Sequence, residues 1–274
     1  MKPIKVMVNG IPGNMATKVA EHVFGDERFE LIPCSLTGLE ITAVEFTIGS
    51  QTIALIRPDQ RELAIAEIKT REGAFISVDF TRPSAVVSNA EFYRNHILPF
   101  VMGTTGGDRK RLGEIVADSA IVAVIAPNMA KPIVGFQAMM ELAANTFPGL
   151  FTGYSLEIRE SHQASKKDTS GTAKAMVGCF DKLGIPFLED QIIKARDPAT
   201  QMILGVPGQY LAGHGWHTYT LVSPDQTVKL EFIHNVNGRD VYAVGTLDAI
   251  AFLAKKIKEG AKGKVFTMID VLKG

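Results

Sequence analysis

The pattern of apolar positions changes part-way along the chain, and this change predicts two domains. In the first half, short apolar runs alternate with segments whose apolar residues recur at helical spacing. The apolar runs predict strands at Ile4–Val8, Phe29–Cys34, Phe75–Asp79, Pro99–Met102 and Ile121–Ile125. The segments between them predict helices at Asn14–Phe24, Gln60–Lys69, Pro83–Asn95 and Arg109–Ala117. Such alternation is typical of βαβ units that build a parallel sheet.

One segment of the first half departs from this alternation. Glu45–Ile56 contains two β-prone runs on either side of Gly49 and Ser50, which predicts a hairpin inserted in the βαβ pattern.

The second half has a different order of predicted helices and strands. A long apolar helix at Ile133–Thr146 leads into candidate strands at Gly153–Glu160, Trp216–Val222 and Val228–His234, whose short connections favour antiparallel pairing. Near the end, "TLDAIAFLAKKIKEG" predicts an amphipathic helix suited to packing on the first sheet. We therefore expect an α/β protein. A Rossmann-like parallel-sheet domain would comprise residues 1–131 and 247–274, and a second α+β domain with a mixed, largely antiparallel sheet would comprise residues 132–246.

Composition narrows the classes of function. Among 274 residues, Lys+Arg and Asp+Glu both number 29, so nothing favours binding to nucleic acid or to an anionic membrane. No apolar run reaches the length of a membrane-spanning helix. The two cysteines, Cys34 and Cys179, are expected to be single buried thiols. Because the chain starts directly in a strand, without a signal or transit segment, we expect a cytoplasmic protein.

The first strand-turn-helix has the composition of a phosphate-binding turn. In "VMVNGIPGNMATKVA", glycines would let the main chain approach a pyrophosphate, and the helix N-terminus would offer unpaired N–H groups. Gly-x-x-Gly-x-x-Ala is looser than the dinucleotide fingerprint, and any tight turn of this kind needs a glycine. The candidate cofactor-binding residues are Gly10, Ile11, Pro12, Gly13, Asn14 and Met15.

The end of the second strand bears on the choice of cofactor. The dinucleotide fingerprint expects a carboxylate about 20 residues after the glycines, to hold the ribose hydroxyls. Ser35 and Thr37 stand there instead. Hydroxyls can donate to a 2′-phosphate that a carboxylate would repel, which favours NADPH over NADH. An ordinary polar strand end is the alternative.

Other strand ends are also rich in glycine and threonine. "VDFTRPSAV", "PFVMGTTGGD" and "APNMAKP" each follow a predicted strand of the first half. In open parallel sheets, ligands bind at the carboxyl ends of the strands. We therefore add further cofactor-binding candidates: Gly103, Thr104, Thr105, Ala126, Pro127, Asn128 and Met129.

A polar junction, "ESHQASKKDTSGTAKA", separates a strand from a helix in the second half. Ser170 stands where an N-cap is expected, so the first-turn N–H groups should face the same loop as His162 and Lys166. A helix N-terminus beside a lysine and a histidine can bind a carboxylate. Histidine titrates near neutrality and lysine can donate a proton, so proton transfer is also possible here. A capped helix that follows a solvated loop is the alternative.

Five motifs taken in order resemble one family. "GIPGNM", "DFTRP", "GTTG", "APN" and "ESHQASKKDTSGTA" are similar to those of the dihydrodipicolinate reductases. The resemblance runs nearly end to end, and "GHGWHTYTLVSPDQTVKLEFIHNVNGRDVYAVGTLDA" is most similar to the plant-type branch. It implies reduction of a cyclic dicarboxylate, 4-hydroxy-tetrahydrodipicolinate, to tetrahydrodipicolinate by NADPH or NADH, in lysine biosynthesis through diaminopimelate. It also implies a homotetramer formed through the second domain's sheet, with a homodimer as the alternative.

The resemblance assigns roles to the junction. His162 would be the active-site histidine and Lys166 the proton donor, while Gly171 and Thr172, with Ser170 and Gln163 beside them, would bind substrate. Where the common bacterial form has a second histidine and further basic residues, this chain has "QAS". The second substrate carboxylate therefore needs another cation, for which Arg239 is the candidate.

The same resemblance gives roles to the glycine-rich strand ends. The first turn would contact the dinucleotide phosphates, Gly103–Thr105 would line the nicotinamide ribose region, and Ala126–Met129 would complete that side.

Two other functions use the same architecture. A nucleotide-sensing protein without catalysis would not need His162 and Lys166. A semialdehyde dehydrogenase would need a cysteine nucleophile and lacks the Ser-Gly-Thr cap. His214 and His217 lie three residues apart without an evident third ligand, so we expect no metal site.

Overall fold

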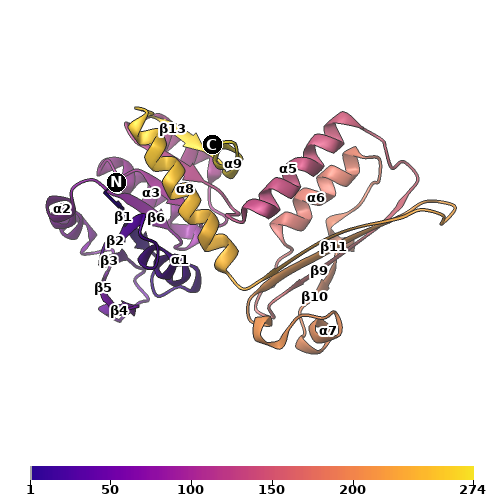
Figure 1. Ribbon diagram of the computed structural model, residues 1–274, viewed down its shortest axis with the longest axis horizontal. Helices are drawn as coiled ribbons and strands as arrows, with labels where there is room; N and C mark the ends of the chain where they lie inside the picture. Colours follow the sequence, from indigo (N-terminus) through magenta and orange to yellow (C-terminus); the bar gives the residue numbers. More distant parts are fainter. Residues whose placement is uncertain (1) are drawn as a thin grey trace. The chain divides into compact units, whose positions relative to one another are not determined.

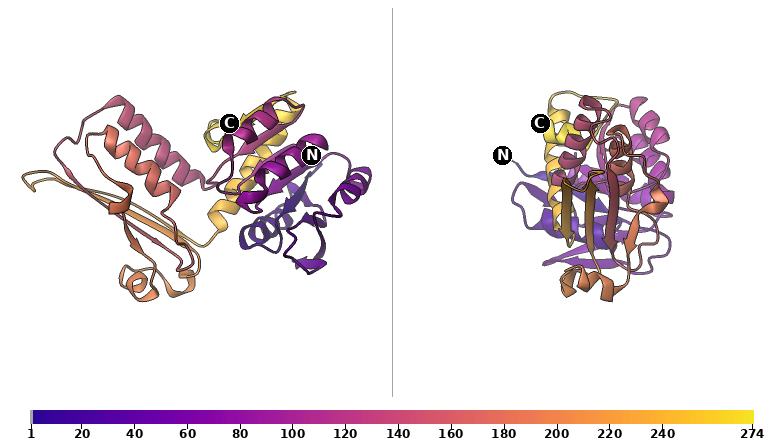
Figure 2. Two further views of the ribbon diagram at one scale, coloured as in Figure 1. Left: turned by 180° about the vertical axis from the view of Figure 1, so that it is seen from behind. Right: turned by 90° about the vertical axis from the view of Figure 1, so that its right-hand side faces the viewer.

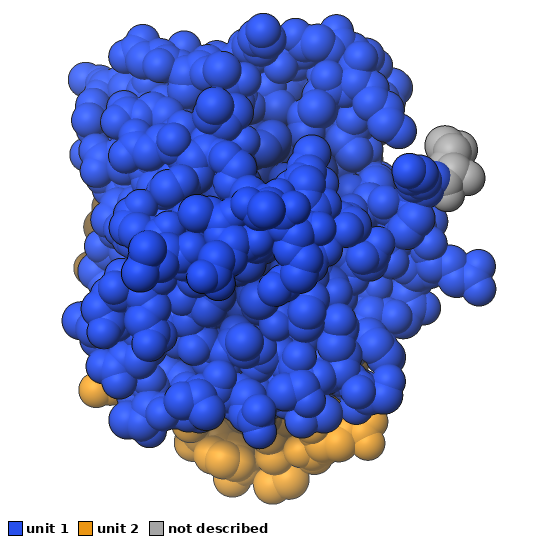
Figure 3. All heavy atoms as spheres, turned by 90° about the vertical axis from the view of Figure 1, so that its left-hand side faces the viewer, with its two compact units in different colours: residues 1–131, 240–274 blue, residues 132–239 orange. Residues whose placement is uncertain are grey.

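The computed structural model describes residues 2–274 and divides the chain into two compact units. Unit 1 contains Met1–Lys131 and Asp240–Gly274, and unit 2 contains Pro132–Arg239. Figure 3 draws the two units in different colours. The second boundary lies between Arg239 and Asp240 and not between residues 246 and 247, because helix α8 (Asp240–Lys258) runs unbroken through the expected position.

Unit 1 is built on a six-stranded sheet in the order β13-β8-β7-β6-β1-β2, and every neighbouring pair is parallel. Its strands are β1 (Ile4–Asn9), β2 (Phe29–Leu31), β6 (Ile76–Asp79), β7 (Phe100–Met102), β8 (Val122–Ile125) and β13 (Lys264–Phe266). The strands β6 and β7 are buried at every position, which explains their continuous apolar runs. The predicted α/β class with a parallel sheet is confirmed. The edge strand β13 escaped prediction because it is only three residues long.

Helices connect these strands (Figure 1). They are α1 (Asn14–Phe24), α2 (Arg61–Glu72), α3 (Val86–Asn95), α4 (Arg109–Ala117), α8 and α9 (Met268–Lys273), with a 3-10 turn η1 (Pro83–Ala85) before α3. The predicted C-terminal helix packs beside α1 and begins at Asp240, six residues before Thr246. Within residues 2–274, no helix is long and apolar enough to cross a membrane.

A small second sheet in unit 1 contains the predicted hairpin. Strands β4 (Glu45–Ile48) and β5 (Gln51–Ile56) are antiparallel, and β5 also pairs in parallel with β3 (Cys34–Leu36). The predicted strand Phe29–Cys34 is therefore two strands in two sheets. The break falls at Pro33, which has no N–H to donate to a ladder. This change of sheet brings Leu36 beside the first turn, where its carbonyl accepts from the Gly10 N–H at 2.9 Å.

Unit 2 has a four-stranded mixed sheet in the order β10-β9-β11-β12. The pair β10–β9 is parallel and the other two pairs are antiparallel, as the predicted mixed sheet requires. Its strands are β9 (Ser155–His162), β10 (Ile193–Ala195), β11 (His214–Val222) and β12 (Lys229–Asn237). Its helices are α5 (Lys131–Thr146), α6 (Gly171–Lys182) and α7 (Pro198–Ile203), with 3-10 turns η2 (Glu189–Gln191) and η3 (Gly208–Tyr210).

Helices α5 and α6 lie side by side on one face of this sheet (Figures 1 and 2). The core between them contains Met140 of α5, Phe180 of α6 and Tyr219 of β11. Since α6 is held against the sheet in this way, its N-terminus is fixed close to the end of β9. The polar junction connects these two points.

Candidate active site

The turn after β1 fits a dinucleotide pyrophosphate. Gly10 has φ +104°, and a Cβ there would lie 2.4 Å from the Phe80 carbonyl oxygen, so a side chain has no room. The Gly13 N–H donates to the Gly10 carbonyl at 2.8 Å and closes the turn. Gly13 is also the N-cap residue of α1, and no side chain caps this helix. Its exposed first turn, which begins at Asn14, therefore leaves main-chain donors available for an anion.

Ser35 and Thr37 do not take the position expected of them. Ser35 has no exposed surface, and its hydroxyl accepts from the Ile11 N–H at 3.2 Å. Thr37 is buried and donates to the Ile11 carbonyl at 3.0 Å. Both hydroxyls thus hold the glycine turn in place through the main chain of Ile11. Because the change of sheet at Pro33 turns these hydroxyls inward, they do not support the expected preference for NADPH, and a cofactor-binding role of Ser35 stays a prediction without side-chain support.

A charged pair beside the turn was missed by sequence reasoning. Glu40 Oε1 lies 2.8 Å from Arg82 Nη2, and both side chains are partly exposed. Glu40 folds back over Gly38, where a Cβ would lie 2.3 Å from its carboxylate. Glu40 follows β3 and Arg82 follows β6, so the pair joins two strand ends that flank Gly10. A carboxylate therefore is present close to the expected place, accompanied by a guanidinium.

The strand-end loops are joined by one buried carboxylate. Asp79, with no exposed surface, accepts from the hydroxyls of Thr81 (2.8 Å), Thr104 (2.9 Å) and Tyr93 (2.8 Å), and from the amide of Asn89 (2.9 Å). These bonds replace the water that the carboxylate loses on burial. They tie the loop after β6 to the loop after β7.

Asn9 extends this network to the first turn. Its amide donates to the Tyr93 hydroxyl at 3.1 Å, and its side-chain oxygen accepts from the Leu36 N–H at 2.9 Å. Burial, together with the neighbouring Asp79 charge, raises the pKa of Tyr93, which stays a neutral donor. The candidate cofactor loops are therefore positioned relative to one another by side-chain hydrogen bonds that run between them.

The remaining cofactor candidates differ in what they expose. Gly103 lies where a Cβ would be 2.2 Å from the Phe80 ring, and Thr104 points inward. Ala126 and Met129 are buried, whereas Thr105 and Pro127 are exposed. The half-buried Asn128 accepts from the Ala130 N–H at 2.9 Å, and the half-buried Met15 lies in the first turn of α1. Gly103, Thr104, Ala126 and Met129 can thus offer only main chain to a ligand.

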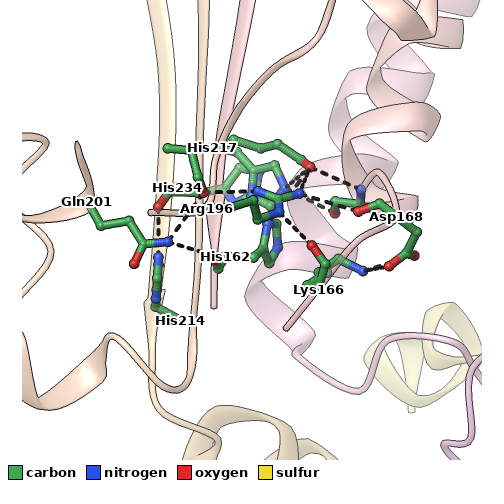
Figure 4. Close-up of polar contacts among 12 residues, drawn as sticks. His162, Lys166, Asp168, Arg196, Gln201, His214, His217 and His234 are labelled. Atoms are coloured by element: carbon green, nitrogen blue, oxygen red, sulfur yellow. Dashed lines mark hydrogen bonds and ion pairs between the residues drawn. The ribbon is translucent and has the colours of Figure 1, made fainter. Parts of the chain in front are cut away.

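The polar junction, with Lys166, Asp168 and Arg196 labelled in Figure 4, is organised by Glu160 near the end of β9. Its side chain has no exposed surface, accepts from the Ser170 N–H at 3.0 Å and forms an ion pair with Arg196. Ser170 is the N-cap residue of α6, as predicted, but its hydroxyl does not cap the helix and lies 3.1 Å from His217 Nε2. The first-turn amides therefore stay open, and nothing lies within 4 Å of a Cβ placed on Gly171.

Three histidine rings stand beside this carboxylate. The centroids of His162 and His217 are 5.0 Å apart, and His217 stacks on His234 at 4.5 Å. Burial lowers the pKa of His162 to about 3, aided by the Arg196 and Lys166 charges, and burial lowers that of His234 to about 4. Burial also places the pKa of His217 well below its usual value. The expectation that His162 titrates near neutrality is wrong, because the ring is a buried neutral imidazole.

Lys166 is the cation of this loop. Its Nζ lies 2.9 Å from Asp168 Oδ1, and its carbonyl accepts from Arg196 Nε at 2.8 Å. Gln163 is half-buried, and its carbonyl accepts from the Lys166 N–H at 2.9 Å. Thr172 is half-buried in the first turn of α6. The structure thus brings His162, Lys166 and the open helix N-terminus together.

Arg239 lies elsewhere in unit 2, just after β12. It donates to the Ala212 carbonyl at 3.4 Å, and a Cβ on Gly213 would lie 2.8 Å from its guanidinium. The loop that it contacts leads into β11, whose Gly215 is paired with His162. Arg239 is therefore one strand away from the junction and makes no recorded contact with Lys166 among residues 2–274.

Three side chains could supply metal ligands. Glu160, His162 and His217 each offer an atom, and these atoms lie within 4.8 Å of one another. The Glu160 carboxylate, however, is already paired with Arg196 and bonded to the Ser170 amide. A divalent cation would have to share this carboxylate with a guanidinium, so the cluster fits an ion pair better than a metal centre.

Comparison with known proteins agrees with this geometry. Residues 4–129 match the family model "Dihydrodipicolinate reductase, N-terminus", and residues 133–272 match "Dihydrodipicolinate reductase, C-terminus". The chain belongs to the dihydrodipicolinate reductase family. It is 47% identical over 271 residues to 4-hydroxy-tetrahydrodipicolinate reductase 2, chloroplastic, of Arabidopsis thaliana, covering 98% of this chain and 77% of that protein. A probable rice reductase is 46% identical, with 98% and 78% covered.

Solved structures share the fold. A dipicolinate-bound dihydrodipicolinate reductase from Paenisporosarcina sp. TG-14 matches with a TM-score of 0.65 at 18% identity, covering 97% of both chains. A diaminopimelate dehydrogenase from C. glutamicum matches with a TM-score of 0.54 at 9% identity, covering 98% of this chain and 94% of the other. The family's N-terminal domain is a nucleotide-binding Rossmann domain that uses NADH or NADPH, in agreement with the expected cofactor.

The relatives correct one prediction. The expectation of a cytoplasmic protein rested on a chain that starts directly in a strand. It is wrong in the light of four plant relatives, 43% to 47% identical, that are all named as chloroplastic.

The buried histidines predict acid sensitivity of the fold. Their pKa values are lower in the folded state than the ordinary 6.5, so the unfolded state binds more protons as pH falls below about 6.5. Stability should be fully present above that pH and should fall towards pH 4, by up to about 1.4 kcal/mol per pH unit for each such histidine. Thermal unfolding measured from pH 8 to pH 4.5 checks this, and His234→Phe should reduce the slope. A melting temperature that does not change with pH would contradict it.

The Glu40–Arg82 pair predicts how the cofactor is chosen. A carboxylate favours ribose hydroxyls and a guanidinium favours a 2′-phosphate, so wild-type kcat/KM values for NADPH and NADH should lie within about tenfold. Glu40→Gln should raise the NADPH:NADH ratio of kcat/KM and Arg82→Gln should lower it. The exposed pair Lys229–Glu231 in unit 2 provides a control, since Glu231→Gln should leave the ratio unchanged. If both Glu40→Gln and Arg82→Gln leave the ratio unchanged, the pair does not contact the adenosine ribose.

Proposed function

We propose that this chain reduces 4-hydroxy-tetrahydrodipicolinate to tetrahydrodipicolinate with NADPH or NADH, in lysine biosynthesis through diaminopimelate. The observation that carries the proposal is the uncapped N-terminus of α6 next to Lys166, in a chain whose relatives bear the name of that reductase. Unit 1 would bind the dinucleotide. Unit 2 would bind the substrate and form the oligomer, a homotetramer or alternatively a homodimer.

The glycine turn and the two glycine-rich loops would hold the dinucleotide. Gly10 to Met15 would meet the phosphates with main-chain N–H groups and the N-terminus of α1. The exposed Thr105 and Pro127 would contact the nicotinamide side, and the other residues of Gly103–Thr105 and Ala126–Met129 would contribute main chain. A nicotinamide held there would supply the hydride that the substrate ring takes up.

The residues of unit 2 would bind the substrate and move the proton. The amides of Gly171 and Thr172 would hold one carboxylate, and Arg239 would serve the other. The net reaction consumes a hydride and a proton and releases the 4-hydroxyl as water. Lys166 Nζ would deliver the proton, while neutral His162 would orient the substrate by hydrogen bonding.

The two other functions have less support. A dehydrogenase with a cysteine nucleophile needs a thiol of lowered pKa. Burial raises the pKa of both Cys34 and Cys179 instead. A nucleotide sensor would give no reason for a lysine and an uncapped helix to meet beside a fully buried ion pair.

Lys166 should carry the proton-transfer step. Lys166→Ala is expected to lower kcat by about two to four orders of magnitude, the usual range for a general acid. The dissociation constant for NADPH should barely change, because the lysine is not on the glycine turn. Cofactor oxidation followed by absorbance measures the first and fluorescence titration the second. Lys167→Ala is the matched control, since this neighbouring lysine is exposed. Wild-type turnover in Lys166→Ala would remove the lysine from the mechanism.

Thr172 tests whether the substrate carboxylate is bound by main-chain donors. Thr172→Ala removes only the hydroxyl and should raise the substrate KM modestly. Thr172→Pro deletes an amide donor and biases Gly171 away from helical geometry, so it should raise KM much more. Steady-state kinetics, with circular dichroism to check folding, measure both. If neither substitution changes KM, the carboxylate lies elsewhere.

A further inference from the structure

Arg196 is a largely buried cation that the proposed chemistry does not use. It follows β10, and its side chain is 19% exposed. Its guanidinium donates to three main-chain carbonyls, those of Lys166 (2.8 Å), Ala195 (3.1 Å) and Asp168 (3.3 Å), and also to the Glu160 carboxylate. Two of these carbonyls belong to the junction loop, residues 163–169. A planar group with several fixed donors is suited to holding a loop in this manner.

Glu160 holds the other end of the same loop. Its second carboxylate oxygen accepts from the N–H of Ser170, the N-cap residue of α6. Because the carboxylate has no exposed surface, it depends on Arg196 for its counter-charge. The ion pair therefore links the main chain at Lys166, the main chain at Asp168 and the N-terminus of α6 into one rigid arrangement (Figure 4).

The loop has few other constraints. Ala164, Ser165, Lys167 and Asp168 are exposed, and the Lys166 N–H bonds only within the loop, to the Gln163 carbonyl. The partner of the Lys166 ammonium, Asp168, is itself 77% exposed. Among residues 2–274, the hydrogen bond that ties the Lys166 main chain to unit 2 outside the loop is thus the one from Arg196 Nε to the Lys166 carbonyl.

We infer that the Glu160–Arg196 ion pair is a positioning device that sets the place of the proton-donating Lys166 relative to the carboxylate-binding N-terminus of α6. Neither member needs to touch the substrate. This inference rests on the proposed function. A misplacement of about 1 Å in a reacting group can cost about a hundredfold in rate, so a loop freed from Arg196 should lose turnover before it loses binding.

Substitutions of Arg196 and of Glu160 should have different effects on kcat and on the substrate KM. Arg196→Lys keeps a positive charge opposite Glu160 and leaves the bond from the Ser170 amide to Glu160. An ammonium has three donors on one atom, so it cannot serve the four acceptors that Arg196 reaches from Nε, Nη1 and Nη2. Arg196→Lys should lower kcat by about a hundredfold and leave the substrate KM within about threefold. Glu160→Gln retains an acceptor for Ser170 but leaves Arg196 without its counter-charge. It should change both kcat and KM, because it acts on both ends of the loop.

The experiment measures kcat, KM and the NADPH dissociation constant for wild type, Arg196→Lys, Arg196→Ala and Glu160→Gln. Arg159→Lys on the same strand is the control, since Arg159 is exposed and pairs with Glu157. Added guanidinium at millimolar concentration should restore kcat at least tenfold in Arg196→Ala, whereas urea should not. If Arg196 had only a structural role, its variants would have lower melting temperatures, and guanidinium would not restore kcat. Unchanged kcat in both Arg196 variants, or a loss confined to KM, would overturn the inference.

Hydrogen exchange separates failure of this inference from failure of the proposed function. Amides of residues 163–170 should exchange faster in Arg196→Lys than in wild type, and those of α5 should not. If wild type fails to reduce 4-hydroxy-tetrahydrodipicolinate while exchange rises as expected, the proposed function is wrong and the positioning stands. If wild type is active and exchange in the loop is unchanged, the positioning is wrong.

Discussion

A carboxylate removed from water must be matched by donors within the protein, and both functional regions of this chain are organised by that requirement. Asp79 and Glu160 have no exposed surface at their side chains and lie at or near the carboxyl ends of β6 and β9, where the chain leaves a sheet. Each gathers donors from segments distant in sequence. The loops that offer main-chain groups to a ligand are thereby held by one buried charge in each unit. Removing the charge would release several loops together.

The two buried carboxylates receive their hydrogen bonds from different kinds of donor. Asp79 is surrounded by hydroxyl and amide donors from Thr81, Thr104, Tyr93 and Asn89, all of them neutral. The loops after β6 and β7 are thus tied together by neutral donors, and the nearby cations are the exposed Arg82, paired with Glu40, and the half-buried Arg109, which donates to the Thr104 carbonyl. Glu160 instead takes a guanidinium. In the junction beside it, Lys166 is the cation that pairs with the exposed Asp168, and the neighbouring rings of His162, His217 and His234 remain neutral.

Much of the fold could be read from the sequence because most of its elements carry a local signal. The βαβ alternation, the hairpin at residues 45–56 and the N-cap position of Ser170 each depend on residues close together in the chain. The features that could not be predicted depend on which strands pair with one another in the folded chain. Pro33 ends one strand and starts another in a different sheet, which turns Ser35 inward. Arg196 and His217 join the junction through the ladders of β10 and β11 with β9, and no spacing in the sequence reveals these pairings.

The chain's departure from the common bacterial motif has a physical counterpart in the junction. "QAS" stands where that form has a second histidine and further basic residues, so the loop itself carries fewer cations. The positive character then comes from the open N-terminus of α6, from Lys166 and, one strand away, from Arg239. Helix amides are fixed donors whose strength does not depend on protonation. The position of these amides depends on how α6 is held in unit 2. The Glu160 carboxylate holds its N-terminus through the Ser170 N–H, and the packing of Phe180 on Tyr219 holds the helix against the sheet.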